Sequence, residues 1–190
     1  MSLARNQKGL GLIEILLAVL LLGIGAVGLA SMQIKAKRMT YEAVQRSVAT
    51  SLARDIIERM RNNPGALASY VVTNYGDNDN RTEPTPNCSS ASCTTAQLAA
   101  HDLWEWERAL LGATETTVDG GNTALVGGLN IPRACITHNA GEISVAIVWK
   151  GFDEHSNPNT ATTCGEGLGL YGTSDAARQV MLITTFIEEI

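Results

Sequence analysis

The chain opens with a short basic leader and then one long apolar run. From Ile15 to Ile34 no side chain is charged, and a helix of that length crosses a hydrocarbon core of about 30 Å. Apolar residues then recur every three or four positions, at Tyr41, Val44, Val48, Leu52 and Ile56, which is helical spacing. The first proline is Pro64, which blocks continuation. The pattern predicts one helix from Leu10 to Arg61, apolar in its first half and amphipathic in its second.

Beyond Pro64 the pattern changes to a polar, turn-rich segment, residues 65–93, which predicts a loop outside the core. A second helix is expected from Thr94 to about Leu111, because Thr94 and Gln97 fit a capping box and Gly112 is placed to end it. Its apolar face would comprise Ala99, Leu103, Trp106 and Leu110. Its charged, solvated face would comprise Asp102, Glu105 and Arg108.

The remainder alternates between apolar and polar positions, as strands do. A short strand is expected at Arg133–Thr137, and a second carries Ile143, Val145, Ile147 and Trp149 on one face. The Asn139-Ala140-Gly141 turn joins them as a hairpin, and residues 179–187 form a third strand. The sequence therefore predicts an α+β protein in which a long N-terminal helix packs on a small antiparallel sheet.

One carboxylate, Glu14, lies at the start of the apolar run. A charge inside a membrane helix costs roughly 2.5–3.5 kcal/mol on insertion scales, so Glu14 indicates a partner. A secretory signal peptide cut near Ala30 is one interpretation, but the run exceeds the usual length of about 7–15 residues. A plain membrane anchor is another, and it explains neither Glu14 nor the Lys8-Gly9 junction.

The junction Lys8-Gly9, followed by Leu10-Gly11-Leu12-Ile13-Glu14, resembles the class III signal of type IV pilins and type II secretion pseudopilins. Leu10 stands where that family usually has Phe or Met, and Gly11 where it usually has Thr. The resemblance implies that a prepilin peptidase cuts after Gly9 and methylates the amine of Leu10. It also implies that Glu14 pairs with the N-terminal amine of a neighbouring subunit. Residues 1–9 would be the leader, 10–34 the membrane and filament-core half of the helix, 35–64 its amphipathic half, and 65–190 a globular head.

Motifs in the head resemble the PilV-type minor pilins, namely RMRNNPGA, the C-x4-C pair before TAQLAAHDLWEWERALLG, and the ACITH and VAIVWKG strands. This resemblance implies the type IV pilin fold and a minor pilin that joins a complex priming pilus assembly. It also implies support of twitching motility and adhesion, with other minor pilins, the major pilin and the peptidase as partners. A type II secretion pseudopilin is the nearer alternative, and an exported, membrane-anchored binding or enzymatic domain the more distant one.

Four cysteines, Cys88, Cys93, Cys135 and Cys164, all follow the apolar run. An even number in an exported domain favours two disulfides. Cys88 and Cys93 are close enough to close a small ring, and Cys135 with Cys164 would join a strand to the loop after Trp149, although three pairings are possible. A zinc site is poorly supported, because no second close pair accompanies C-x4-C. The basic leader residues favour a cytoplasmic N-terminus, which together with the cysteines predicts an inner-membrane precursor with a periplasmic head.

The formal net charge of −5 hides an asymmetry. Residues 10–64 carry a net charge of +3, whereas residues 65–190 carry −10. Binding to phosphate backbones relies on Lys and Arg, so the acidic head disfavours a nucleic-acid partner.

The sequence contains no convincing active site. His101, His138 and His155 fall on a helix, a strand end and a loop. Gly165–Gly169 lacks the lysine of a P-loop, no G-x-S-x-G motif is present, and Asp102, Glu105 and Glu107 are expected on a solvated helix face. Trp104 and Trp106 are more often core and rim than a sugar platform. We therefore expect no enzyme activity, cofactor or metal.

Overall fold

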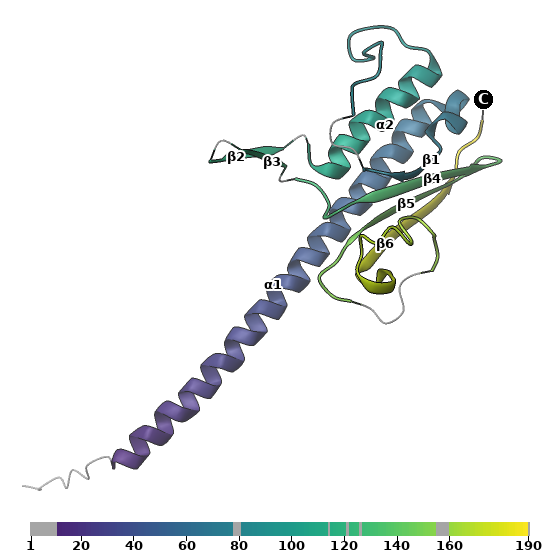
Figure 1. Ribbon diagram of the computed structural model, residues 1–190. Helices are drawn as coiled ribbons and strands as arrows, with labels where there is room; N and C mark the ends of the chain where they lie inside the picture. Colours follow the sequence, from purple (N-terminus) through teal and green to yellow (C-terminus); the bar gives the residue numbers. More distant parts are fainter. Residues whose placement is uncertain are drawn as a thin grey trace, which may run out of the picture. The chain divides into compact units, whose positions relative to one another are not determined.

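The computed structural model describes residues 11–77, 81–113, 115–120, 122–125, 127–154 and 160–189 (Figure 1). The chain divides into two compact units, residues 1–41 and 42–190, and each is described by itself. The predicted leader, residues 1–9, and Leu10, the predicted site of methylation, lie outside the described residues.

Helix α1 (Leu12–Asn62) is continuous and begins in the first unit and ends in the second. The predicted helix is confirmed, and its C-terminal end lies one residue beyond the predicted Arg61. The turn Asn63-Pro64 ends it, and a short 3-10 helix, η1 (Pro64–Tyr70), follows. Gly23, Gly25 and Gly28 do not interrupt the helix, because it is assigned as α-helix throughout.

The second unit contains a four-stranded antiparallel sheet. Its strands are β1 (Val72–Tyr75), β4 (Arg133–Asn139), β5 (Glu142–Lys150) and β6 (Arg178–Phe186), in the order β1-β4-β5-β6 (Figure 1). The hairpin predicted between β4 and β5 is present. Its turn residues Ala140 and Gly141 both have positive φ, which the tight turn of a two-residue hairpin requires.

Helix α2 (Thr95–Leu111) begins and ends where its sequence predicts. Thr94 accepts the N–H of Gln97 while the Gln97 side chain accepts the N–H of Thr94, so the capping box is complete. Gly112 ends the helix in the left-handed conformation. A side chain could not replace its hydrogen, because a Cβ there would lie 2.1 Å from the backbone nitrogen of Gly128.

The main core lies between one face of the sheet, α2 and the second half of α1. From β4 and β5 it receives Ala134, Ile136, Ile143, Val145, Ile147 and Trp149. Helix α2 contributes the apolar face predicted from its sequence, Ala99, Leu103, Trp106 and Leu110. The α+β architecture expected from the sequence is therefore present.

The stripe of α1 that enters this core differs from the predicted one. Tyr41 and Val44 are 40% and 52% exposed, and Val48 and Leu52 are only partly buried. The buried positions are Gln45, Ala49, Ala53, Ile56, Ile57 and Met60. The alanines hold the inner positions because small side chains let the neighbouring elements approach α1 closely, a reason that a count of large apolar residues misses.

The prediction that residues 65–93 form a loop outside the core is wrong for their first part. Ala66, Leu67 and Tyr70 of η1 are buried, and β1 joins the sheet edge. The sequence pattern did not predict the separate hairpin of β2 (Thr116–Asp119) and β3 (Asn122–Leu125) or the short η2 (Thr173–Asp175). These segments are too short for their apolar periodicity to stand out.

Of the three possible cysteine pairings, the structure has Cys88–Cys93 and Cys135–Cys164. The second disulfide fixes the long loop after β5 to the outer face of the sheet. There Cys135, Ala146 and Val148 pack with Cys164 and Tyr171 in a smaller core. Burial raises the pKa of Tyr171 to about 12.

Candidate functional site

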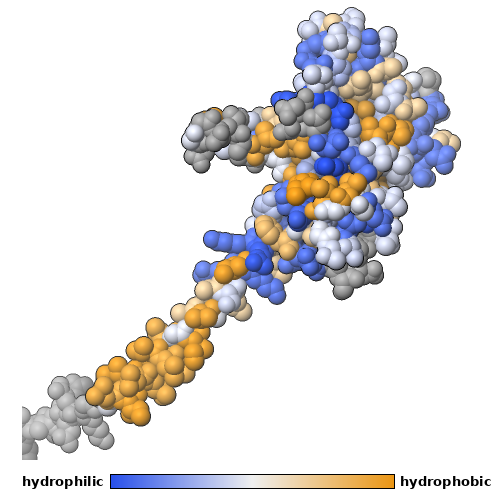
Figure 2. Space-filling view, viewed as in Figure 1, coloured by the Kyte–Doolittle hydropathy of each residue, from blue (hydrophilic) through white to orange (hydrophobic). Residues whose placement is uncertain are grey.

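The described part of the first unit is a helix with no core of its own. Every described residue from 11 to 41 is exposed, and the apolar segment stands out along the helix in Figure 2. The exposed large apolar residues on it are Leu12, Ile13, Ile15, Leu16, Leu17, Val19, Leu20, Leu21, Leu22, Ile24, Val27, Leu29, Met32, Ile34 and Met39. An apolar surface of this extent marks a lipid or protein contact.

Among the described residues, α1 is the one helix that is long and apolar enough to cross a membrane, judged by its length and composition. An apolar helix all round is expected either inside a protein core or inside a membrane. No part of its apolar window is buried in this chain. The cover must therefore come from outside the described structure.

Glu14 lies in the first turn of α1 and is exposed. The partial positive charge of a helix N-terminus favours an anion at this place. No Lys or Arg of α1 can reach it, because the first one along the helix is Lys35, 21 residues or about 32 Å away at ~1.5 Å per residue. A cation for Glu14 must come from the segment before α1 or from another chain.

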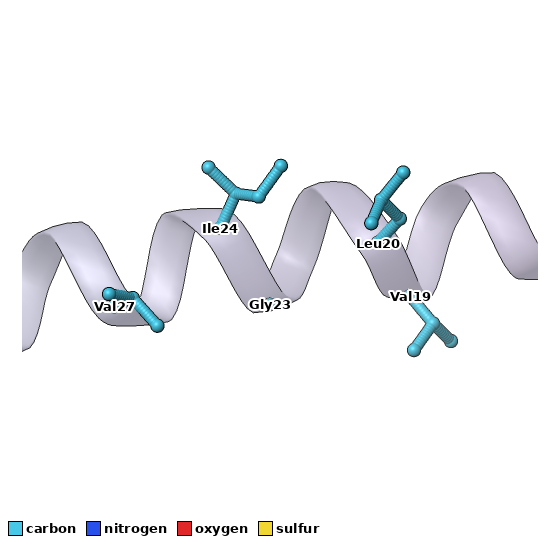
Figure 3. A pocket seen from close by; sticks show the side chains of 5 residues that line it. All are labelled: Val19, Leu20, Gly23, Ile24 and Val27. Atoms are coloured by element: carbon cyan, nitrogen blue, oxygen red, sulfur yellow. The ribbon is translucent and has the colours of Figure 1, made fainter.

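Gly23 makes a shallow notch in the apolar surface (Figure 3). Val19 and Val27 lie one turn before and one turn after it, and Leu20 and Ile24 border it. A Cβ built on Gly23 would meet no other atom within 4 Å. Small residues of this kind let a second helix approach closely in a membrane or a bundle, so the notch is a place where another helix can pack.

The head contains a polar network that joins α1, η1 and α2. Arg59 donates to Asp102 at 3.0 Å and to Glu105 at 2.6 Å, and Tyr70 donates its hydroxyl to the other oxygen of Asp102. Burial alone would lower the pKa of Arg59, but the hydrogen bonds to Glu105 and Asp102 outweigh it and the pKa is raised. Burial, and then the bond to Asp102, raise the pKa of Tyr70.

A second network surrounds Glu107, whose carboxylate accepts hydrogen bonds from Arg81 and from the backbone N–H of Gly76. Asp102 and Glu107 are both buried, so their predicted place on a solvated face is wrong. The error has a physical cause, since a carboxylate can be buried once arginine and backbone donors satisfy it, and those donors come from distant segments. Burial first, and Glu107 next, raise the pKa of Tyr75 to about 12.

The two described histidines and the tryptophans of α2 make contacts within the fold. His101 is buried beside Trp104, and His138 accepts the N–H of Gly141, while His155 lies outside the described residues. The indole N–H groups of Trp104 and Trp106 donate to backbone carbonyls of Arg81 and Leu52. Among the residues searched, which are the described ones, no three His, Cys, Asp or Glu side chains are grouped to hold a metal.

The comparisons with known proteins agree with this geometry. Residues 31–104 match the family model of the type IV pilin Tt1218, and residues 4–30 match the prokaryotic N-terminal methylation motif. No curated protein and no solved structure matches the chain.

The fold and the two matches support the same class of protein. The chain has the α+β fold of a type IV pilin and carries a prepilin N-methylation motif. Type IV pilins are structural proteins, and the matches support a pilin-type role. The motif implies processing by a prepilin peptidase and assembly with other pilins, and with the apolar helix it fits a membrane-anchored precursor.

Proposed function

We propose that this chain is a minor pilin of the PilV type, which joins other minor pilins in a complex that primes pilus assembly. The observation that carries the proposal is the exposed apolar helix, which combines a methylation motif with a single carboxylate at its start. A finished soluble protein would not leave this surface uncovered. A subunit that moves from lipid into a filament covers it twice, first with lipid and then with other helices.

The order of events follows from the sequence motif. The chain is inserted as a single-pass precursor in the inner membrane with its head in the periplasm. A prepilin peptidase cuts after Gly9 and methylates the new amine on Leu10. The two disulfides of the head support an oxidising compartment for it.

Glu14 then selects the neighbouring subunit. A carboxylate surrounded by apolar side chains needs a cation, and α1 offers none within about 32 Å. The N-terminal amine of an adjacent mature chain, created by the cut after Gly9, is a cation at the matching depth. Pairing of Glu14 with that amine would fix how far one helix slides along the next.

The head supplies the contacts to other pilins at the cell surface. It carries a net charge of −10 over residues 65–190, and its motifs resemble those of PilV-type proteins. In this role the protein supports pilus formation, and through it twitching motility and adhesion.

The first experiment is to map the N-terminal residue and its modification on protein recovered from cells with and without prepilin peptidase. A chain beginning at methylated Leu10 only when the peptidase is present is the expected result. A chain beginning near Ser31 would contradict the proposal and indicate a soluble exported domain. An intact Met1 in normal cells would indicate a permanent anchor.

Loss of the gene then separates the pilus from the secretion apparatus. For a minor pilin we expect fewer surface pili and reduced twitching, with enzyme secretion unchanged. Loss of enzyme secretion with normal pili would instead identify a type II secretion pseudopilin, which shares the signal and the helix.

A further inference from the structure

Three cations follow the apolar run at once, Lys35, Lys37 and Arg38, here called the basic cluster. All three are exposed on α1. No Asp or Glu occurs between Glu14 and Glu42, so this stretch of helix has no compensating charge of its own.

The ion pairs found among the described residues leave the basic cluster unpaired, since none of them includes Lys35, Lys37 or Arg38. Glu42, one turn after Arg38, is the first carboxylate after the cluster. Its side chain instead accepts the backbone N–H groups of Phe152 and Asp153 at 3.0 and 3.3 Å. The cluster is therefore free to bind an external anion.

The spacing places these cations at the depth of lipid headgroups. Residues 15–34 span about 30 Å as a helix at ~1.5 Å per residue, which equals the hydrocarbon thickness of a bilayer. Lys35, Lys37 and Arg38 follow within about 6 Å of the end of this segment. Long Lys and Arg side chains at such a position reach into the headgroup layer.

The cluster lies on one side of the helix. At about 100° per residue, Lys37 lies roughly 200° and Arg38 roughly 300° around the helix from Lys35, so all three fall within an arc of about 160°. Lipid headgroups surround the helix and meet all three.

Basic residues directly after the apolar run oppose export of the head that follows them. Two basic leader residues, Arg5 and Lys8, precede the apolar run, whereas three follow it within four residues. The cluster therefore opposes the charge bias of the leader, and the placement of the head in the periplasm rests on its two disulfides. A favourable interaction must compensate for keeping the cluster.

We propose that Lys35, Lys37 and Arg38 bind the phosphates of anionic phospholipids in the periplasmic leaflet and so hold the precursor at a fixed depth before assembly. This inference rests on the membrane-inserted precursor of the proposed function, but not on which filament the chain joins. Each cation near an anionic surface contributes about fivefold to binding. The acidic head of another subunit is the competing partner, and the position of the cluster at the end of a segment as long as the hydrocarbon core favours lipid.

The test uses the full chain with its disulfides intact, reconstituted in vesicles of phosphatidylcholine with a minority of phosphatidylglycerol. Native mass spectrometry counts the lipids that remain bound. We expect phosphatidylglycerol to be enriched on the wild type and the variant K35Q/K37Q/R38Q to lose that enrichment by about tenfold or more. Flotation with the vesicles checks that every variant inserts, and glutamine preserves helix propensity.

The matched control is R46Q/R54Q, set against K35Q/K37Q. Arg46 and Arg54 are exposed on the same helix, but they lie about 18 and 30 Å past Ile34, beyond the Debye length of about 8–10 Å. The control should retain the enrichment that K35Q/K37Q loses, and raising the salt to about 1 M should weaken the enrichment.

Cross-linking separates lipid from protein, because only a protein partner gives a cross-linked product with another chain. Equal enrichment in the wild type and the triple variant would overturn the proposal. So would a loss on R46Q/R54Q as large as that on K35Q/K37Q. Cross-linking of Lys35 or Lys37 to another pilin head in place of lipid would assign the cluster to assembly instead. None of these results alters the cut after Gly9, so the two proposals fail separately.

Discussion

The first and second halves of α1 belong to one continuous helix but differ in how their side chains are covered. Residues 12–41 expose their side chains, most of them apolar, whereas residues 45–60 bury one narrow stripe against a sheet and a second helix. The second half is stabilised by its own chain through packing and ion pairs. The first half has no such support and depends on lipid or on another subunit. Stability and assembly are therefore encoded in separate parts of one helix.

The sharpest way to break this comparison is to change Glu14, because we expect the variant to affect assembly and leave the head unchanged. Glu14→Gln keeps the size of the side chain and removes its charge. We expect incorporation into filaments to be lost, measured by immunoblotting of sheared pili, while cleavage after Gly9 continues. The control is Glu58→Gln, an exposed carboxylate on the same helix that pairs with Arg61, which should assemble normally. Normal incorporation of Glu14→Gln would contradict the pairing with an amine.

Removing a disulfide should instead lower the stability of the head, because both disulfides lie in the second unit. Removing Cys135–Cys164, which are 29 residues apart, should lower the free energy of unfolding by about 3–4 kcal/mol. The Cys88–Cys93 bridge, with a separation of 5, should contribute only about 2 kcal/mol, because it closes a short loop. Urea unfolding of the double serine variants, followed by the fluorescence of buried Trp106 and Trp149, measures both values. Equal losses would contradict the loop-length explanation.

Arg59 pairs with the buried Asp102 and with the exposed Asp55, so the two pairs test how burial changes the contribution of an ion pair to stability. Asp102→Ala should destabilise the head by about 3 kcal/mol, because Arg59 and Tyr70 both lose their buried partner. Asp55→Ala removes another partner of the same arginine, but the side chain of Asp55 is 47% exposed. Exposed pairs contribute below about 1 kcal/mol, so this control should unfold close to wild type. A large effect of Asp55→Ala would show that burial is not the deciding factor.

The smallest effect is expected at the notch in the exposed half. Gly23→Leu should leave the unfolding of the head within about 0.5 kcal/mol of wild type, because no other atom lies within 4 Å of a Cβ at this position. Filling the notch should nevertheless reduce co-assembly several-fold if a neighbouring helix packs there. Gly23→Ala adds only a methyl group, so its co-assembly should lie between that of the wild type and that of Gly23→Leu. Co-purification with partner pilins measures the effect, and unchanged assembly of Gly23→Leu would assign the glycine no packing role.

Local sequence was sufficient wherever neighbouring residues decide the structure. Thr94, Gln97 and Gly112 fixed both ends of α2, and Asn139-Ala140-Gly141 fixed the hairpin between β4 and β5. The apolar run and its carboxylate were visible for the same reason, because length, charge and apolar content are properties of the chain itself. The methylation motif matched there independently.

What only the tertiary structure decided depends on partners that are far away in the sequence. Ala49 and Ala53 are inner residues of α1 because the sheet and α2 approach there, and no periodicity ranks alanine above leucine. Asp102 and Glu107 are buried because Arg59 and Arg81 satisfy them from other elements. Burial of a polar or small side chain is set by the atoms that surround it, and sequence spacing does not show those atoms until the chain has folded.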